Sequence, residues 1–114
     1  MTTLFFRTFS LKDSLSEEEV LDFWDLLLHQ IKPATENVPG VRSYHVFLGP
    51  GAHRANITVL IEMEDAATYE RILSDPGVRK HLGTFYGAWD LKTATQAFLR
   101  EASPEVVRGL AGKA

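Results

Sequence analysis

The stretch LFFRTF, residues 4–9, decides the fold, because its aromatic and β-branched residues favour a strand that is apolar on both sides. Successive side chains of a strand point to opposite faces of a sheet. Leu4 and Phe6 therefore lie on one face, and Phe5 and Phe9 lie on the other. We expect both faces of the sheet that contains this strand to need cover.

Three further segments are predicted to be strands. Residues 56–64 alternate most clearly, with apolar side chains on one side. Residues 41–48 come before them, and the Gly-Pro-Gly sequence at 49–51 predicts that the two strands form a hairpin with a long tip over residues 49–55. Residues 92–100, rich in Thr and Ala, complete the set as a fourth strand.

The first helix is predicted to start at a capping box, in which Ser16 and Glu19 satisfy each other's backbone N–H groups. Pro33 is expected to end or kink this helix, because proline lacks an N–H group and clashes with the preceding turn. The residues at helical spacing between these points form a broad apolar stripe, widened by Leu28. They are Val20, Phe23, Trp24, Leu27 and Ile31.

The second helical segment is predicted to begin at Asp65. Asp75-Pro76 interrupts it, since this Asp can cap, and this Pro can open, a further turn. Ser103 is placed to start a short terminal helix. We therefore divide the chain into one domain, residues 1–102, and a short C-terminal helical tail, residues 103–114.

The order of the elements is βαββαβ. It folds most simply as an α+β ferredoxin-like domain, a four-stranded antiparallel sheet with two helices on one face. We expect Phe5, Phe9, Phe47 and Leu60 to lie on the open face, where each exposed side chain forgoes roughly 1.5–3 kcal/mol of burial. We therefore predict a homodimer in which a second copy covers that face, sheet against sheet.

Composition restricts the classes of function. The 114 residues carry a formal charge of −3 and scattered Lys and Arg, which excludes a basic surface for nucleic acid. The absence of Cys excludes disulfides, thiolate nucleophiles and Cys-based metal sites. No apolar run approaches the roughly 18 residues of a membrane span. We expect a cytoplasmic protein with neither a nucleic acid nor a membrane as partner.

Two sequences carry a resemblance to a known family. VPGVRSY at residues 38–44 leads from the first helix into the second strand, and ILSDPGV at 72–78 breaks the second helix. Together with the strand order, they resemble the dimeric α/β-barrel superfamily over residues 3–101. That superfamily includes antibiotic-biosynthesis monooxygenase-like, EthD-like and stress-responsive proteins. The resemblance implies a homodimer with a central barrel and, in each subunit, a ligand cavity between sheet and helices.

His81 is the first candidate for chemistry, since haem-binding relatives take an iron ligand from a His on or after the second helix. The pattern of the haem-degrading members is not reproduced, because Trp89 follows His81 instead of preceding it. The alternative interpretation places His81 beside Arg79 and Lys80 on a solvated helix end, where a cation complements the helix dipole.

Aromatic residues are the other candidates. Phe85, Tyr86 and Trp89 can stack on a planar ligand and donate hydrogen bonds to it, or they can fill the core beneath a loop. Core packing is the alternative for the remaining candidates too. These are Tyr44, Trp24 and Met63, on predicted apolar faces of strands and of the first helix.

The sequence thus predicts a homodimer that binds a small apolar or aromatic molecule between sheet and helices. The resemblance implies a cofactor-independent monooxygenase, in which His81, Tyr44 and Tyr86 would bind a phenol or remove its proton. No metal site is expected, because the four His residues of the chain lie on different elements. Two alternatives stay open: a haem protein that uses His81, and a non-catalytic stress-responsive dimer.

Overall fold

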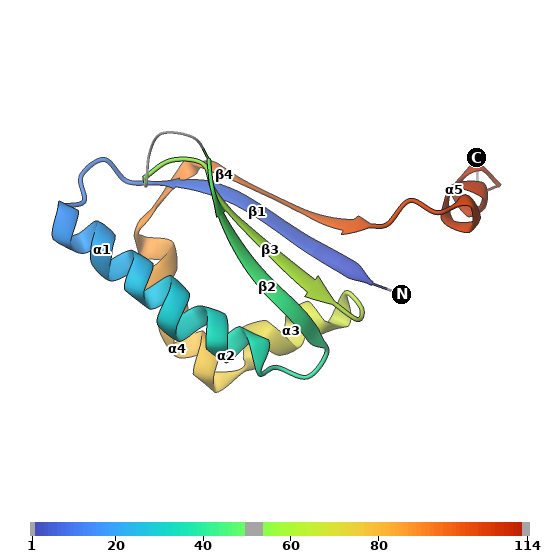
Figure 1. Cartoon of the computed structure of the whole chain (residues 1–114), viewed down its shortest axis with the longest axis horizontal. Coiled ribbons are helices and arrows are strands. Elements are labelled where there is room, and N and C mark those ends of the chain that lie inside the picture. Colours follow the sequence, from blue (N-terminus) through green and yellow to red (C-terminus); the bar gives the residue numbers. More distant parts are fainter. Residues whose placement is uncertain (1, 50–53, 113–114) are drawn as a thin grey trace.

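The computed structural model describes residues 2–49 and 54–112. It contains a four-stranded antiparallel sheet in the order β2-β3-β1-β4, with the helices of residues 17–87 packed against one face (Figure 1). The strands are β1 (Thr3–Leu11), β2 (Val41–Leu48), β3 (Ile57–Met63) and β4 (Trp89–Arg100). The predicted α+β ferredoxin-like fold is confirmed. Residues 50–53 of the hairpin tip lie outside the described residues.

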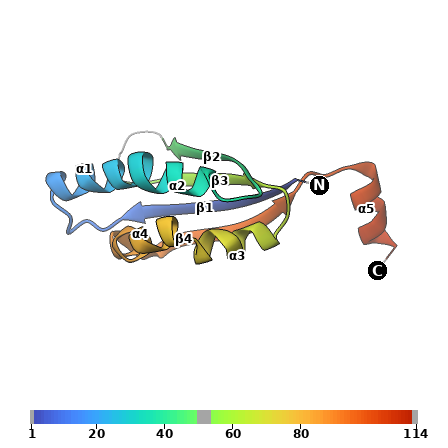
Figure 2. The same ribbon diagram turned by 90° about the horizontal axis from the view of Figure 1, so that it is seen from below.

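Two helical segments lie side by side under the sheet (Figure 2). One contains α1 (Glu17–Leu26), the π-helical turn η1 (Leu27–Ile31) and α2 (Lys32–Glu36). The other contains α3 (Ala67–Ser74) and α4 (Pro76–Gly87). The predicted capping box is present, since Ser16 Oγ accepts a hydrogen bond from Glu19 N at 3.1 Å and Glu19 Oε1 accepts one from Ser16 N at 3.0 Å.

Pro33 does not end the first helical segment. The turn before it widens to a π-helix, in which the N–H of Lys32 donates to Leu27 O, five residues back. Pro33 then stands in the first turn of α2, where the missing N–H group is tolerated. The helix therefore continues to Glu36.

The assignment of Phe5 and Phe9 to the open face is wrong. Both are buried under the helices, and Phe9 stacks on Trp89 with ring centroids 4.0 Å apart. The register explains the difference, because Phe5 pairs with Ile61 of β3 and side chains of paired residues share a face. Ile61 points towards the helices, so Phe5 points towards them as well.

The open face is nevertheless apolar. Phe6 pairs with Leu60, which in turn pairs with His45 of β2, and Phe47 lies further along that strand. Phe47 is 52% exposed, and Leu99 of β4 is also exposed. The sheet is therefore apolar on both faces as predicted, with Leu4 and Phe6 in the place expected for Phe5 and Phe9.

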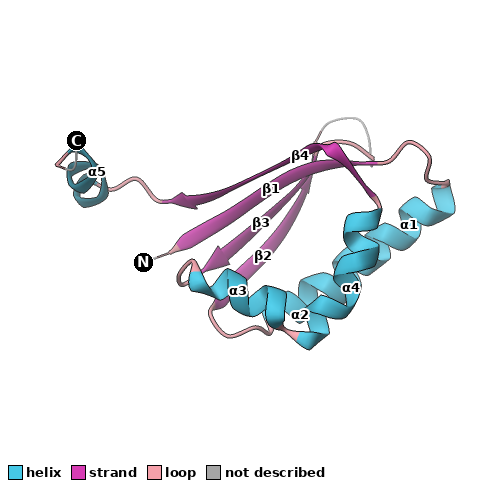
Figure 3. Cartoon of the chain, turned by 180° about the vertical axis from the view of Figure 1, so that it is seen from behind, coloured by secondary structure: helices cyan, strands magenta, loops and turns pink. Residues whose placement is uncertain are grey.

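The C-terminal helix α5 (Pro104–Ala111) lies apart from the sheet and the other helices, beyond the end of β4 (Figure 3). Ser103 caps it by accepting a hydrogen bond from Val106 N at 3.2 Å. None of its residues is buried, and the apolar side chains of Val107 and Leu110 are exposed. Across the described residues, no helix has the length and apolar character needed to cross a membrane.

Replacing Phe9 tests the revised face assignment. Phe9→Ala removes a fully buried ring, so it should lower the free energy of unfolding by about 3–5 kcal/mol. The matched control is Leu21→Ala on α1, because Leu21 is 64% exposed, and it should change stability by about 0.5 kcal/mol or less. Urea denaturation measures both. Equal losses of unfolding free energy in the two variants would contradict the burial of Phe9 under the helices.

Candidate functional site

Arg7 lies in the middle of β1 on the face that the helices cover, and only 9% of its surface is exposed. Its guanidinium donates to three side chains that come from three other elements. Nη2 donates to the hydroxyl of Tyr69 on α3 at 2.8 Å and to Oε1 of Gln96 on β4 at 3.0 Å. Nη1 donates to the hydroxyl of Tyr86 on α4 at 3.3 Å. Arg7 thus joins the sheet to both helices of the second helical segment.

Aromatic rings surround the same guanidinium. Its Cζ atom lies 4.7 Å from the ring centre of Phe5, 5.0 Å from that of Trp89 and 5.4 Å from that of Tyr86. The face of an aromatic ring is electron-rich and attracts a cation within about 6 Å. The rings therefore replace part of the hydration that Arg7 loses on burial.

Arg7 has no acidic partner among residues 2–49 and 54–112, whose ion pairs join other side chains. Arg71, for example, contacts Glu64 Oε1 at 3.1 Å near the surface. Two buried N–H groups in the Arg7 cluster, Nε of Arg7 and Nε1 of Trp89, also lack an acceptor within the described part of the chain. A buried cation without a counter-ion is costly, so this arrangement favours an anion that arrives from outside.

The space beside Arg7 is small. A cavity of about 30 Å³ lies between the sheet and both helical segments, and it holds one or two groups of the size of water. All three tyrosines of the chain line it, although they are far apart in sequence. The full lining is Arg7, Ile31, Thr35, Tyr44, Ile61, Tyr69, Ile72, Leu73, Val78, Leu82, Phe85 and Tyr86.

Two of these tyrosines are held in the protonated form. Burial raises the pKa of Tyr44 far above its usual range, although the nearby charge of Arg7 acts in the opposite direction. Burial also raises the pKa of Tyr69, again against the effect of Arg7. Both phenols therefore act as hydrogen-bond donors at neutral pH, and neither is suited to be a general base.

The structure brings together part of the predicted site. Tyr44, Tyr86 and Phe85 line the Arg7 cavity. Trp89 adjoins it, with its ring 4.9 Å from that of Tyr86. The remaining candidates lie elsewhere: Trp24 borders a separate groove, Met63 is buried at the end of β3, and His81 is half-buried on α4 outside the lining.

The haem alternative does not fit this cavity. His81, the expected iron ligand, does not line the space. Among the described residues, no group of three or more His, Asp or Glu side chains is placed to hold a metal ion.

Sequence reasoning missed Arg7, Tyr69 and Gln96. A signal for Arg7 was present, since it shares the strand periodicity of Phe5 and Phe9, and a charge at a buried position usually has a purpose. The wrong face assignment hid it, because Phe5 and Phe9 were expected to face a second subunit and Arg7 lies on their side of the strand. Tyr69 falls at helical spacing with Ile72 and Leu73, which indicates burial but not contact with Arg7, and Gln96 had no signal of its own.

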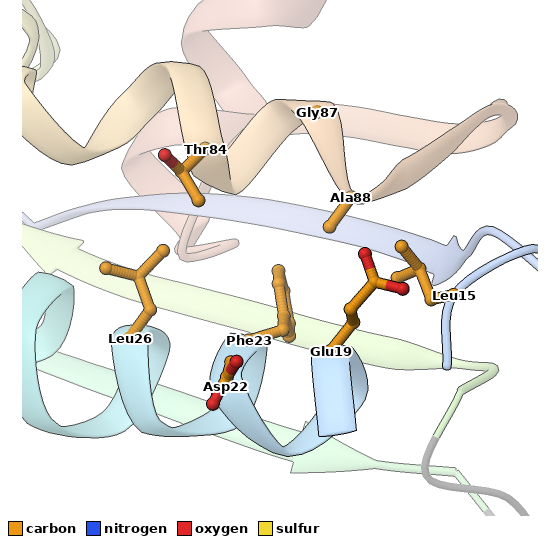
Figure 4. A pocket seen from close by; sticks show the side chains of 8 residues that line it. All are labelled: Leu15, Glu19, Asp22, Phe23, Leu26, Thr84, Gly87 and Ala88. Atoms are coloured by element: carbon orange, nitrogen blue, oxygen red, sulfur yellow. The ribbon is translucent and has the colours of Figure 1, made fainter. Parts of the chain in front are cut away.

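Two larger hollows lie at the surface. One is a groove of about 390 Å³ between α1 and α4, with Phe23 at its floor and the carboxylates of Glu19 and Asp22 near its rim (Figure 4). Glu19 already serves the capping box. The other groove, also about 390 Å³, is bounded by apolar side chains: Trp24, Leu28, Val46 and Leu48. Neither groove gathers the donors and rings that surround Arg7.

No model of a known protein family matches the sequence, and no curated protein matches it significantly. Solved structures are similar in fold. A dimeric protein of unknown function from Bacteroides fragilis, described as ferredoxin-like, aligns at a TM-score of 0.72 and 15% identity over 88% of this chain and 96% of its own. The chain has a ferredoxin-like fold. The resemblance seen in the sequence is confirmed at this level.

Other structural neighbours are described as oxygenases. SnoaB from Streptomyces nogalater, a cofactor-independent oxygenase, aligns at a TM-score of 0.64 and 16% identity over 90% of this chain and 97% of its own. An antibiotic biosynthesis monooxygenase aligns at a TM-score of 0.68 and 13% identity over 90% and 100% of the two chains. Identities this low establish a common fold and leave the activity to be argued from the site.

Alkaline titration tests the protonated state of Tyr44. An unfolded tyrosine ionises near pH 10, whereas folded Tyr44 holds its proton to a higher pH. Its contribution to stability is therefore present below about pH 10 and is lost as the pH rises towards the folded pKa. Tyr44→Phe should lose less stability than the wild type above about pH 10 in urea denaturation. Normal ionisation of all three tyrosines in the folded chain, followed by phenolate absorbance, would contradict this assignment.

Proposed function

We propose that the chain is a homodimeric, cofactor-independent monooxygenase that binds a planar aromatic substrate with an ionised oxygen against Arg7. The observation that carries the proposal is the buried guanidinium of Arg7, which is surrounded by rings and phenol groups and has no acidic partner among the described residues. The cofactor-independent oxygenase of the same fold supports the reaction class.

The chemistry follows from the charge of Arg7. Without a cofactor, the substrate itself must supply the electrons that reduce O₂, and an anion gives up electrons more readily than its conjugate acid. A buried cation lowers the pKa of a substrate phenol or enol beside it, because the interaction is stronger away from water. The proton can then leave to solvent, so a general base in the protein is not required.

The reaction is balanced with O₂ as the only other reactant. The substrate carbanion forms a C–O bond with O₂, and the resulting peroxide takes up a proton. The peroxide then loses water as the O–O bond breaks and a carbonyl forms. An activated CH₂ group and O₂ thus give C=O and H₂O. The substrate carbon loses four electrons, and O₂ gains them.

Entry of a ring requires a change of shape. The cavity of about 30 Å³ holds the oxygen of a substrate but not a polycyclic ring. Leu82 and Tyr86 of α4 form part of the wall, and the break between α3 and α4 at Asp75 provides a place for the helices to move. The proposal therefore includes movement of α4 away from the sheet when substrate binds.

The homodimer is supported by the open face of the sheet. Phe6, Leu60 and Phe47 lie on that face, and the helices of the chain pack on the other. Large exposed apolar patches mark interaction surfaces. Ferredoxin-like neighbours from Bacteroides fragilis and Thermobifida fusca are described as dimeric.

A non-catalytic dimer is the second candidate function. The observation that favours it is the small volume of the cavity, in which the guanidinium of Arg7 is bonded to Tyr69, Tyr86 and Gln96 with little room left. This alternative gives Arg7 a structural role and predicts no oxidation. Oxygen consumption separates the two.

A charge on the open face should prevent dimerisation. Phe47→Glu places a carboxylate in the proposed interface and should give a monomer, because an unpaired charge is not readily buried. Leu21→Glu, on the outer side of α1, is the matched control and should stay dimeric. Sedimentation velocity at micromolar concentration measures both. A wild type that is monomeric at this concentration would refute the proposed assembly.

Anthrone is a suitable probe of oxidation, since its CH₂ group is acidic and its anion is delocalised onto oxygen. The wild type should consume O₂ with anthrone at neutral pH and form the corresponding quinone. Arg7→Met should lower the rate by at least about 100-fold, as expected for the loss of one charge-stabilising group. Arg7→Lys keeps the charge and should retain part of the rate.

Arg79→Met, on the exposed side of α4, is the control for the loss of a positive charge and should match the wild type. Circular dichroism confirms folding of each variant. Equal O₂ uptake in the wild type and Arg7→Met would remove Arg7 from the reaction. No uptake by the wild type would favour the non-catalytic dimer.

A further inference from the structure

We infer that the two subunits of the homodimer exchange their C-terminal helices, so that α5 of one subunit packs into an apolar groove of the other. The groove lies between the first helical segment and β2, and we call it the β2-edge groove. It is bounded by Trp24, Leu28, Val46 and Leu48. The inference rests on the homodimer of the proposed function and goes beyond it, because it adds a second contact between the subunits.

The α5 helix has one apolar side and one charged side. Glu105 and Arg108 lie on the side opposite to the apolar residues, as helical spacing requires. The apolar side consists of Val106, Val107, Leu110 and Ala111. Val107 and Leu110 are each 55% exposed, and no residue of α5 is buried. The helix thus has a side suited to packing, which the described part of its own chain does not bury.

The α5 helix is also too short to be stable without a packing surface. It has 8 residues, and isolated helices of fewer than about 12–15 residues are marginal in water. Gly109 in its interior lowers the helix propensity further. Ser103 satisfies one N–H group of the first turn. The cap fixes the start of the helix, and packing must supply the rest of its stability.

The β2-edge groove of its own chain is out of reach of α5. Arg100, at the end of β4, pairs with Thr3 at the start of β1. Leu48 pairs with Ile57, which pairs with Phe9 near the end of β1. These two ends are about 20 Å apart along the strands, and three strand spacings of about 4.8 Å separate β4 from β2. The three-residue linker before α5 spans at most about 11 Å, so α5 cannot lie along this groove. Figure 1 shows α5 and α1 at opposite ends of the molecule.

The β2-edge groove matches the apolar side of α5. None of its four bounding residues is charged, and Leu28 and Leu48 are 40% and 55% exposed. The groove between α1 and α4 is less suitable, because the aliphatic side of a helix would remove the carboxylates of Glu19 and Asp22 from water there. Burial of apolar surface on both partners is what drives such an association.

A second subunit can bring the groove and the helix together. Two packed sheets can cross with their strands near a right angle. The end of β4 then lies over an edge strand of the partner sheet, and β2 is an edge strand. Leu99, near the end of β4, pairs with Leu4 and is exposed on the open face, so the apolar surface continues from the sheet towards α5. A two-fold axis repeats the contact, and each α5 helix then occupies one groove.

Thiol cross-linking tests the exchange directly, because the chain contains no cysteine. One chain carries Ala111→Cys on α5, and a second chain with a size tag carries Leu48→Cys in the groove. The two are mixed, left to exchange subunits and oxidised mildly. A mixed disulfide should form at least about tenfold faster than in the control, because docking raises the local concentration of the two thiols. The control replaces Leu48→Cys by Arg79→Cys on the exposed side of α4. Denaturing electrophoresis without reductant measures both.

A charge on the apolar side of α5 should weaken the dimer. Leu110→Glu places a carboxylate among apolar side chains, so the dissociation constant of the dimer should rise by at least about tenfold. Gly109→Glu is the matched control, because it adds the same charge on the polar side of α5, where the structure leaves open space around an added Cβ. It should change the dissociation constant by about twofold or less. Sedimentation equilibrium over a series of concentrations measures both.

The outcomes separate the exchange of α5 from the proposed function. A dimeric wild type in which the mixed disulfide forms no faster than in the control overturns the exchange and keeps the dimer. Equal dissociation constants for Leu110→Glu and the wild type also overturn the exchange. A mixed disulfide that persists in chains with Phe47→Glu keeps the exchange and refutes the sheet interface. A mixed disulfide in a protein that does not oxidise anthrone keeps the exchange and removes the oxygenase.

Discussion

The buried guanidinium of Arg7 is the interaction on which the rest of the structure depends. It stands in the middle of a strand that is otherwise packed like a core, and it bonds to side chains from α3, α4 and β4. A charge at this position must be satisfied by its neighbours, because water does not reach it freely. Tyr69, Tyr86 and Gln96 satisfy it only in part. The unmet charge and the unmet N–H groups give a compact core domain a chemical property that an apolar core lacks.

The open face of the sheet is a second and independent constraint. The helices cover Phe5 and Phe9, while Phe6, Leu60 and Phe47 remain on the other side. Assembly of two sheets would bury the exposed face and leave the Arg7 cavity, which lies on the helical side, outside the interface. The fold thus separates the surface proposed for assembly from the cavity proposed for chemistry. The movement of α4 that we propose would then not disturb the proposed dimer.

Local signals in the sequence gave the elements and their order. The capping box at Ser16, the Asp75 cap and the alternation of residues 57–63 act over a few residues, so they are visible without a structure. Pro33 shows the limit of this reasoning. Proline usually ends a helix, but here the preceding turn widens to a π-helix and the helix continues beyond Pro33. The face assignment of β1 failed for a different reason. A strand with aromatic residues on both sides has no preferred face until its register with β3 is known.

The sequence by itself determined the fold class, the order of helices and strands along the chain and the two-sided apolar character of the sheet. It also named Tyr44, Phe85 and Tyr86, which line the cavity. Only the tertiary structure decided what Arg7 does. Its hydrogen-bond partners are 62 to 89 residues away along the chain, and its burial depends on which face the helices cover. Hydrogen bonds of this range leave no periodicity in a sequence, because each partner is placed by a separate element.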